Sequence, residues 1–165
     1  MAKWGKVDYR QFQKFQKDLE KLEKTHHREF YEACAKELAA RLLAKVIKRT
    51  EPRKQEDCPP GVMGGTLRRG WTSKTYEEAI SGGSGSAKDF VDSLQVTKKG
   101  NIYQIEIINP VEYASYVEYG HRTRNHKGWV PGKFMLTISE AELDSQASKI
   151  LEQKLQKYME QIFNQ

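Results

Sequence analysis

The chain has 165 residues, 30% of them charged, and a formal net charge of +6 at pH 7. This length fits one domain, residues 1–165, that buries a core of its own, while the charged fraction and the mean hydropathy of −0.79 favour solvated helices and partner surfaces over a compact enzyme. No apolar run reaches the roughly 18 to 20 residues of a membrane span, and the polar start of the chain predicts no signal peptide.

The positive charge has two interpretations. In the first, the charge binds nucleic acid or an acidic partner. In the second, the cations are spread over solvated helices and have no specific function. Lysines are interspersed with glutamates along the chain, which favours the second interpretation. Cys34 and Cys58 are too few for a disulfide framework, so we expect synthesis in a reducing cytoplasm.

Residues 8–49 are predicted to form one long helix. Large apolar residues recur at spacings of three and four, and the apolar stripe widens after Phe30, which predicts packing on a sheet there. Asp8 is a suitable N-cap, and Pro52 follows the end of the pattern. Such a helix is roughly 60 Å long, so we expect either a kink near residues 25–27 or burial against another subunit.

The middle of the chain is predicted to hold strands, within residues 66–109. A polar loop, residues 50–65, comes first and is long enough to reach a neighbouring subunit. Residues 66–76 alternate enough to predict a strand, whose Arg68 and Arg69 face either solvent or an acidic partner. The glycine- and serine-rich residues 81–88 predict a flexible connection rather than a phosphate-binding loop.

A β-hairpin is the clearest prediction in this region. Residues 90–97 and 102–108 both alternate, and residues 98–101 between them suit a tight turn. The hairpin has apolar faces, and the two long helices are the only elements available to cover them.

The last third of the chain predicts a short helix, a loop and a long helix. Residues 111–119 follow a strand-ending Pro110 and are amphipathic, residues 121–132 form a basic loop, and residues 133–163 return to helical spacing. The predicted fold class is α+β: a long N-terminal helix, a small antiparallel sheet of three to four strands, a short helix and a C-terminal helix.

No catalytic motif is present. The sequence has no Cys-x-x-Cys, His-Glu-x-x-His, Gly-x-Ser-x-Gly or phosphate-binding loop. His26 and His27 are adjacent and would point about 100° apart on a helix, and His121 and His126 have no partner at ligand spacing. We therefore expect neither an enzyme nor a bound metal or cofactor.

Residues 113–134 combine aromatic and basic side chains. The cations suit phosphate or a carboxylate-rich partner, and the aromatics suit base stacking or, as we favour, a core or subunit interface. Glu118 has no catalytic partner, so we expect it to position the basic loop by bonding to Arg122 or Arg124. With the two strand arginines, the predicted partner-binding residues are Arg68, Arg69, Tyr113, Tyr116, Glu118, Tyr119, His121, Arg122, Arg124, Lys127, Trp129 and Phe134.

The same region resembles a known family. The order of a strand, Asn-Pro, Tyr-Ala-x-x-Val-Glu-x-Gly, a variable loop and Val-Pro-x-x-Phe-Met is similar to the tail-completion, or head–tail joining (neck), proteins of long-tailed bacteriophages. A second match is the Gly-x-Leu-Arg-like segment at residues 65–71, whereas residues 51–64 and 81–86 depart from the pattern. The matching residues are Asn109, Tyr113, Ala114, Val117, Glu118, Gly120, Pro131, Phe134 and Met135.

This resemblance implies a virion structural protein of the neck, assembled in the bacterial host cytoplasm. It implies a ring, expected to hold six copies, that binds a head-completion or connector protein on one side and the tail tube or terminator protein on the other, around the DNA channel. Residues 50–65 and 121–132 would order on docking, and non-specific contact with channel DNA is a further expectation. A tail terminator, a minor capsid protein and, in another class, a basic nucleic-acid-binding module stay open as alternatives.

Overall fold

The computed structural model describes the backbone of residues 9–52, 54, 56, 58, 64–82 and 85–163, and the side chains within those ranges from His27 to Gln161. Six helices and four short strands follow one another along these residues. The α+β class predicted from the sequence, with a long helix near each end of the chain, is confirmed. The predicted N-cap Asp8 and the apolar side chains of residues 12–22 lie outside the described residues.

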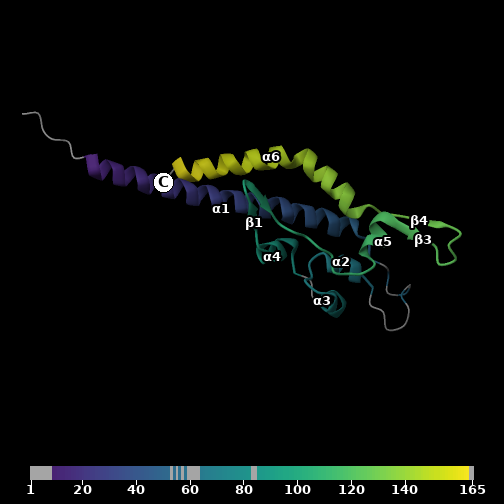
Figure 1. The fold of residues 1–165 in the computed structure, drawn as a ribbon. Coiled ribbons are helices and arrows are strands. Elements are labelled where there is room, and N and C mark those ends of the chain that lie inside the picture. The colour runs from purple at the N-terminus through teal and green to yellow at the C-terminus, as the bar shows by residue number, and fades with distance from the viewer. Residues whose placement is uncertain are drawn as a thin grey trace, which may run out of the picture.

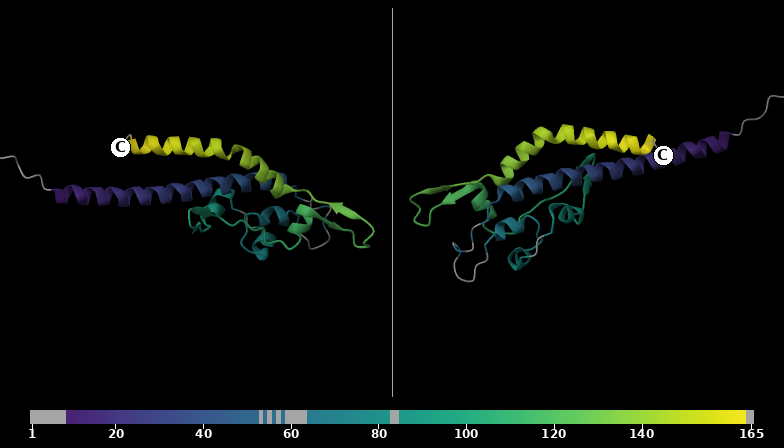
Figure 2. Two further views of the ribbon diagram at one scale, coloured as in Figure 1. Left: turned by 45° about the horizontal axis from the view of Figure 1, so that its top comes forward. Right: turned by 180° about the vertical axis from the view of Figure 1, so that it is seen from behind.

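Two long helices, α1 (Tyr9–Arg49) and α6 (Met135–Phe163), run antiparallel and side by side (Figure 1). The rings of Phe30 and Tyr158, with centroids 4.6 Å apart, join them at the C-terminal end of α6, and an ion pair between Arg49 and Glu142 joins them at the other end. The helix α1 continues without interruption through residues 25–27, where one of our two expectations placed a kink. It also extends past the C-terminal end of α6 (Figure 2).

The core lies on the C-terminal half of α1, where the apolar stripe is widest. Leu43 and Val46 are completely buried there, and Trp71 and Val91 pack with them. The Trp71 indole Nε1 donates to Thr50 Oγ1 over 3.0 Å. Three short helices, α2 (Thr66–Gly70), α3 (Tyr76–Ser81) and α4 (Ala87–Asp92), lie on the side of α1 away from α6 (Figures 1 and 2). Short helices, and not the predicted sheet, therefore cover this face.

The strand predicted over residues 66–76 is wrong, because this segment forms α2, a turn and the start of α3. The Thr75 hydroxyl accepts from Glu78 N over 3.3 Å, and the Glu78 carboxylate accepts from Lys74 N over 2.7 Å. The first bond satisfies a backbone donor that a helix start leaves free, and the second fixes the residue just before the N-cap. Local capping therefore outweighs a weak alternation of apolar residues.

Most of the strand predicted over residues 90–97 is also wrong, because α4 occupies its first part. Ser86 caps this helix: its Oγ accepts from Asp89 N over 3.1 Å. Ala87, Phe90 and Val91, at helical spacings of three and four, pack against the core. Phe90 fits both a strand and a helix pattern, and its burial together with Ala87 and Val91 decides for the helix.

The four strands form two separate antiparallel pairs. In the first, β1 (Thr97–Lys99) pairs with β2 (Ile102–Gln104) around Gly100, whose φ of 61° is easily adopted only by glycine. The predicted hairpin is thus confirmed over these residues, although it is shorter than expected. In the second, β3 (Gly120–Arg122) pairs with β4 (Trp129–Pro131), so that Gly120 faces Pro131. The predicted single sheet of three to four strands is therefore divided into two.

An extended segment leads from β2 to the last third of the chain, and Asn109 fixes it to α2. The Asn109 side chain donates from Nδ2 to Leu67 O over 2.9 Å and accepts at Oδ1 from Val111 N over 3.2 Å. Gly70 lies under it: a Cβ at this position would meet Asn109 Oδ1, and would lie 2.8 Å from Val111 Cγ2. Among the described residues, no helix is long and apolar enough to cross a membrane.

Candidate interaction site at the hairpin end

One end of the molecule carries the short helix α5 (Ala114–Tyr119) and the β3–β4 hairpin, which projects beyond the helix pair (Figure 1). Gly120 both ends α5, by donating its N–H to Tyr116 O, and begins β3. Its φ of 85° suits glycine, and a Cβ there would lie 2.5 Å from Val130 O. Gly132 is equally tight, since its Cβ would lie 2.6 Å from Tyr119 C. Two glycines therefore let the base of the hairpin close against α5.

Glu118 fixes the direction of the hairpin, but by a contact that the sequence did not predict. Its side chain is only 4% exposed, and its carboxylate accepts from Leu136 N at 3.0 Å, Thr137 N at 2.9 Å and Thr137 Oγ1 at 2.8 Å. These donors belong to the first turn of α6, so the carboxylate caps that helix. The expected bond to Arg122 or Arg124 is replaced by one to α6.

Backbone bonds complete this junction. Lys133 N donates to Val117 O over 2.8 Å, and Phe134 N donates to Glu118 O over 3.1 Å. Phe134 has a φ of 48°, in the left-handed region, which turns the chain from the hairpin into α6. The helix α5, the hairpin base and the start of α6 therefore form one connected unit.

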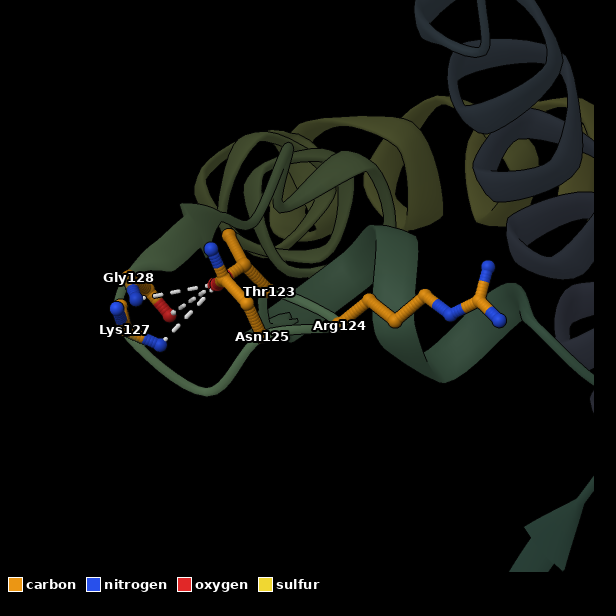
Figure 3. A pocket seen from close by; sticks show the side chains of 5 residues that line it. All are labelled: Thr123, Arg124, Asn125, Lys127 and Gly128. Atoms are coloured by element: carbon orange, nitrogen blue, oxygen red, sulfur yellow. Dashed lines mark hydrogen bonds between the residues drawn. The ribbon is translucent and has the colours of Figure 1, made fainter.

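The tip of the hairpin is built by two polar side chains (Figure 3). The Thr123 hydroxyl donates to Asn125 Oδ1 over 2.7 Å and accepts from Gly128 N over 3.0 Å, while Asn125 Oδ1 also accepts from Lys127 N over 3.2 Å. These residues and Arg124 line a shallow, open hollow of about 750 Å³. The side chain of Arg124 extends away from Lys127 and Gly128 (Figure 3). The tip therefore has a definite shape before any partner binds.

The cations of the hairpin are exposed. Arg122, Arg124 and Lys127 all face solvent, and none of them forms an ion pair with another residue in the described part of the chain. His121 lies beside Tyr116, with ring centroids 5.9 Å apart in an edge-on arrangement. The structure thus brings together the predicted basic residues of this loop.

The aromatic residues predicted for a core or an interface are on the surface. Tyr119 is 61% exposed and Trp129 is 60% exposed, and the others are also largely accessible. Because so much aromatic surface faces water, packing within this chain does not account for these side chains. The exposed aromatic set comprises Tyr113, Tyr116, Tyr119, Trp129 and Phe134.

A groove of about 550 Å³ lies between α5, the hairpin and the start of α2. The two arginines predicted to bind a partner, Arg68 and Arg69, differ in their orientation here. Arg68 is exposed and lines the groove. Arg69 is turned inward: its guanidinium donates to Ala79 O and to Gly64 O, each over 2.8 Å. Arg69 therefore connects α2 to α3. The sequence did not predict this structural role.

The described residues hold no group of three or more His, Cys, Asp or Glu side chains placed to share a metal ion. What this end of the molecule offers is a contact surface: exposed aromatics at the base of a hairpin, cations at its tip and a groove beside it. The fold and this surface define an α+β protein in which a long helix pair carries a projecting basic hairpin.

The chain belongs to the HK97-gp10-like family of bacteriophage proteins. The family model, described as "Bacteriophage HK97-gp10, putative tail-component", matches residues 13–120. The resemblance to phage tail proteins predicted from the sequence is thereby confirmed, and the protein is a bacteriophage tail component of the virion. The match ends at Gly120, so β3, β4 and α6 lie almost wholly outside it. Comparisons with curated proteins and with solved structures each gave no match.

Proposed function

We propose that this tail component joins the head of the phage to its tail. Copies of the chain, six by expectation, form a ring at the neck between the head connector and the tail tube, around the channel through which DNA leaves. The observation that carries this proposal is the exposed aromatic surface of α5 and the hairpin base, led by Tyr119 and Trp129. Aromatic residues are enriched in the buried centres of protein interfaces.

The hairpin is already folded in the single chain. This differs from our expectation that residues 121–132 order only on docking, because Thr123 and Asn125 hold the tip and Glu118 holds the base. A surface that is organised before binding loses less conformational entropy on association. Much of the loop of residues 50–65 lies outside the described residues, so its ordering stays a prediction.

A ring also agrees with the unlike ends of the molecule. One end of the helix pair carries the hairpin, and at the other α1 continues alone past α6 (Figure 2). Subunits that associate through unlike surfaces form rings when the rotation closes. The proposal gives the protein no enzymatic activity and no cofactor; its partners are its own copies, a connector or head-completion protein, and the tail tube or its terminator.

Electron microscopy of particles made by a phage that lacks this gene tests the proposal. DNA-filled heads lying apart from tails of normal length would support a joining function. Tails of abnormal length would assign the protein to tail termination instead. Intact, infectious particles would overturn both functions.

Complementation of that deletion tests the aromatic surface itself. We expect the variant Tyr119→Ala/Trp129→Ala to leave heads and tails unjoined and to reduce plaque counts by at least tenfold, because a buried aromatic anchor contributes about 2 kcal/mol or more to an interface. The matched control is Tyr76→Ala, since Tyr76 is also an exposed aromatic but lies on α3. Normal joining by the double variant would contradict the proposed interface.

A further inference from the structure

The β3–β4 hairpin lies in a stretch of the chain whose charge is one-sided. Residues 119–139 contain the cations Arg122, Arg124, Lys127 and Lys133 and no Asp or Glu at all. Of these, the first three lie between the base and the tip of the hairpin. Residues 38–50 also hold four cations and no Asp or Glu, but Arg41 pairs there with Glu37, and Lys45 and Arg49 pair with Glu142.

Several cations of the helix pair are compensated by nearby carboxylates. On the helix pair, Arg28 pairs with Glu32 and Arg41 with Glu37, while Lys45 reaches Glu142 over 3.2 Å between α1 and α6. The solvated, mutually compensated charge that the sequence predicts is thus found on the helices. On the hairpin the cations have no carboxylate beside them, which leaves their charge available to an external anion.

The shape of the tip separates structural residues from charged ones. The hydrogen-bonding side chains Thr123 and Asn125 are occupied within the loop, and His126 adopts a φ of 57° as the chain turns. The exposed side chains left to meet a partner are the long cations and two histidines. No apolar side chain lies between residues 121 and 128, so the tip presents charge without a hydrophobic anchor.

We infer that the β3–β4 hairpin binds the phosphate backbone of duplex DNA through Arg122, Arg124 and Lys127. An acidic protein surface fits less well, because the aromatic side chains that anchor protein interfaces lie at the base of the hairpin and not at its tip. A two-stranded ribbon is narrow enough to follow a DNA groove. Because the neutral polar groups are used internally, binding is independent of base sequence.

This inference deepens the proposed function, on which the position of the hairpin in the channel rests. In a ring, the hairpin cations of all copies would together surround the passing DNA. Each hairpin alone binds weakly, which suits a surface that must let DNA slide, and several copies together hold a static duplex more firmly.

Fluorescence anisotropy of a labelled 30-base-pair duplex with the purified full-length chain tests DNA binding without requiring a ring. Three phosphate contacts predict that the logarithm of the association constant falls with the logarithm of salt concentration at a slope of about −3. We expect the variant Arg122→Gln/Arg124→Gln/Lys127→Gln to bring that slope close to zero. A second duplex of unrelated sequence should give the same constants as the first.

The control variant removes the same charge elsewhere: Lys74→Gln/Lys99→Gln/Lys149→Gln changes three exposed lysines and should leave most of the slope in place. Equal losses in the two variants, or no binding by the unchanged chain at 25 mM salt, would overturn the inference. So would a hairpin variant that binds DNA normally but fails to join heads to tails, since this would assign the hairpin to an acidic protein. Failure of the joining function in the deletion phage leaves the anisotropy result unaffected.

Discussion

Glu118 shows how a single buried carboxylate connects distant parts of this chain. It lies on α5, yet it accepts hydrogen bonds from the first turn of α6, 18 and 19 residues further on. The sequence pattern singled out Glu118, but predicted Arg122 or Arg124 as its partner in place of the start of α6. Neither Leu136 nor Thr137 carries a signal that pairs it with Glu118, because donors on a helix start are backbone groups common to all residues but proline.

Replacement of Glu118 should therefore weaken the whole junction. We expect Glu118→Ala to lower the free energy of unfolding by about 2–4 kcal/mol, since it leaves buried N–H groups without an acceptor. Glu118→Gln keeps one acceptor oxygen and should cost about half as much. Urea denaturation measures both, and Glu140→Ala, an exposed change on α6, should stay within about 0.5 kcal/mol of the unchanged protein.

Gly70 is the second residue whose change should be costly. A Cβ there would displace the Asn109 side chain and its bonds to Leu67 and Val111, so we expect Gly70→Ala to destabilise the protein by about 1–3 kcal/mol. The same change in an Asn109→Ala background should cost less, because part of the clash is gone. Gly85→Ala is the matched control, since nothing lies within 4 Å of its added Cβ. Equal effects at Gly70 and Gly85 would refute this account.

The two cysteines should differ in reactivity. Burial raises the pKa of the Cys34 thiol, which lies on α1 and is 8% exposed, whereas Cys58 is half-buried in the loop before α2. A thiol reagent such as Ellman's reagent should label one cysteine in the native protein and the second only on unfolding. Peptide mapping identifies which one reacts first, and comparable native rates at both sites would contradict the burial of Cys34.

Among the elements, the α1–α6 pair should be sensitive to acid. Hydrogen bonds from Arg49 and Lys45 lower the pKa of Glu142 below its ordinary value of 4.5. A carboxyl whose pKa is lower in the folded state stabilises the fold above its unfolded pKa, and that contribution is lost as the pH falls through the folded pKa. The stability of Glu142→Gln should therefore change less than that of the unchanged protein below about pH 4.5. Thermal melting across this range, with Glu152→Gln as a control on the same helix, measures the difference.

The elements also show which sequence signals were sufficient. The long helices were predictable because apolar spacing persisted over many turns, whereas α2 to α4 are too short for a period to decide. Their capping residues carried the missing signal: Thr75 with Glu78, and Ser86 with Asp89. The β3–β4 hairpin was described only as a loop because three-residue strands show no alternation. Its composition nevertheless predicted a cluster of basic and aromatic side chains, which the structure places on the surface at one end of the molecule.

At the scale of the whole molecule, α1 is the longest element of the described chain. It is unbroken over Tyr9–Arg49, so it lacks the kink that was one of our two expectations. The other expectation, burial against another subunit, stays a prediction. The part that extends past α6 (Figure 2) is where the proposed ring would bury it. The composition favoured an elongated shape, but the sequence could not show what covers α1, because apolar periodicity reports which face of a helix is buried and not which chain covers it.

The way the hairpin is attached has a consequence for how such proteins diversify. Its base is closed by Gly120 and Gly132, and the bonds that hold the junction are made by Val117, Glu118 and the first residues of α6. His121 contacts Tyr116 of α5 and Pro131 pairs with Gly120, whereas the side-chain bonds of residues 123–128 are made within the hairpin. These hairpin residues can therefore be replaced as one block. A phage that replaces them acquires a new contact at this end of the protein, while the helices that carry the hairpin stay unchanged.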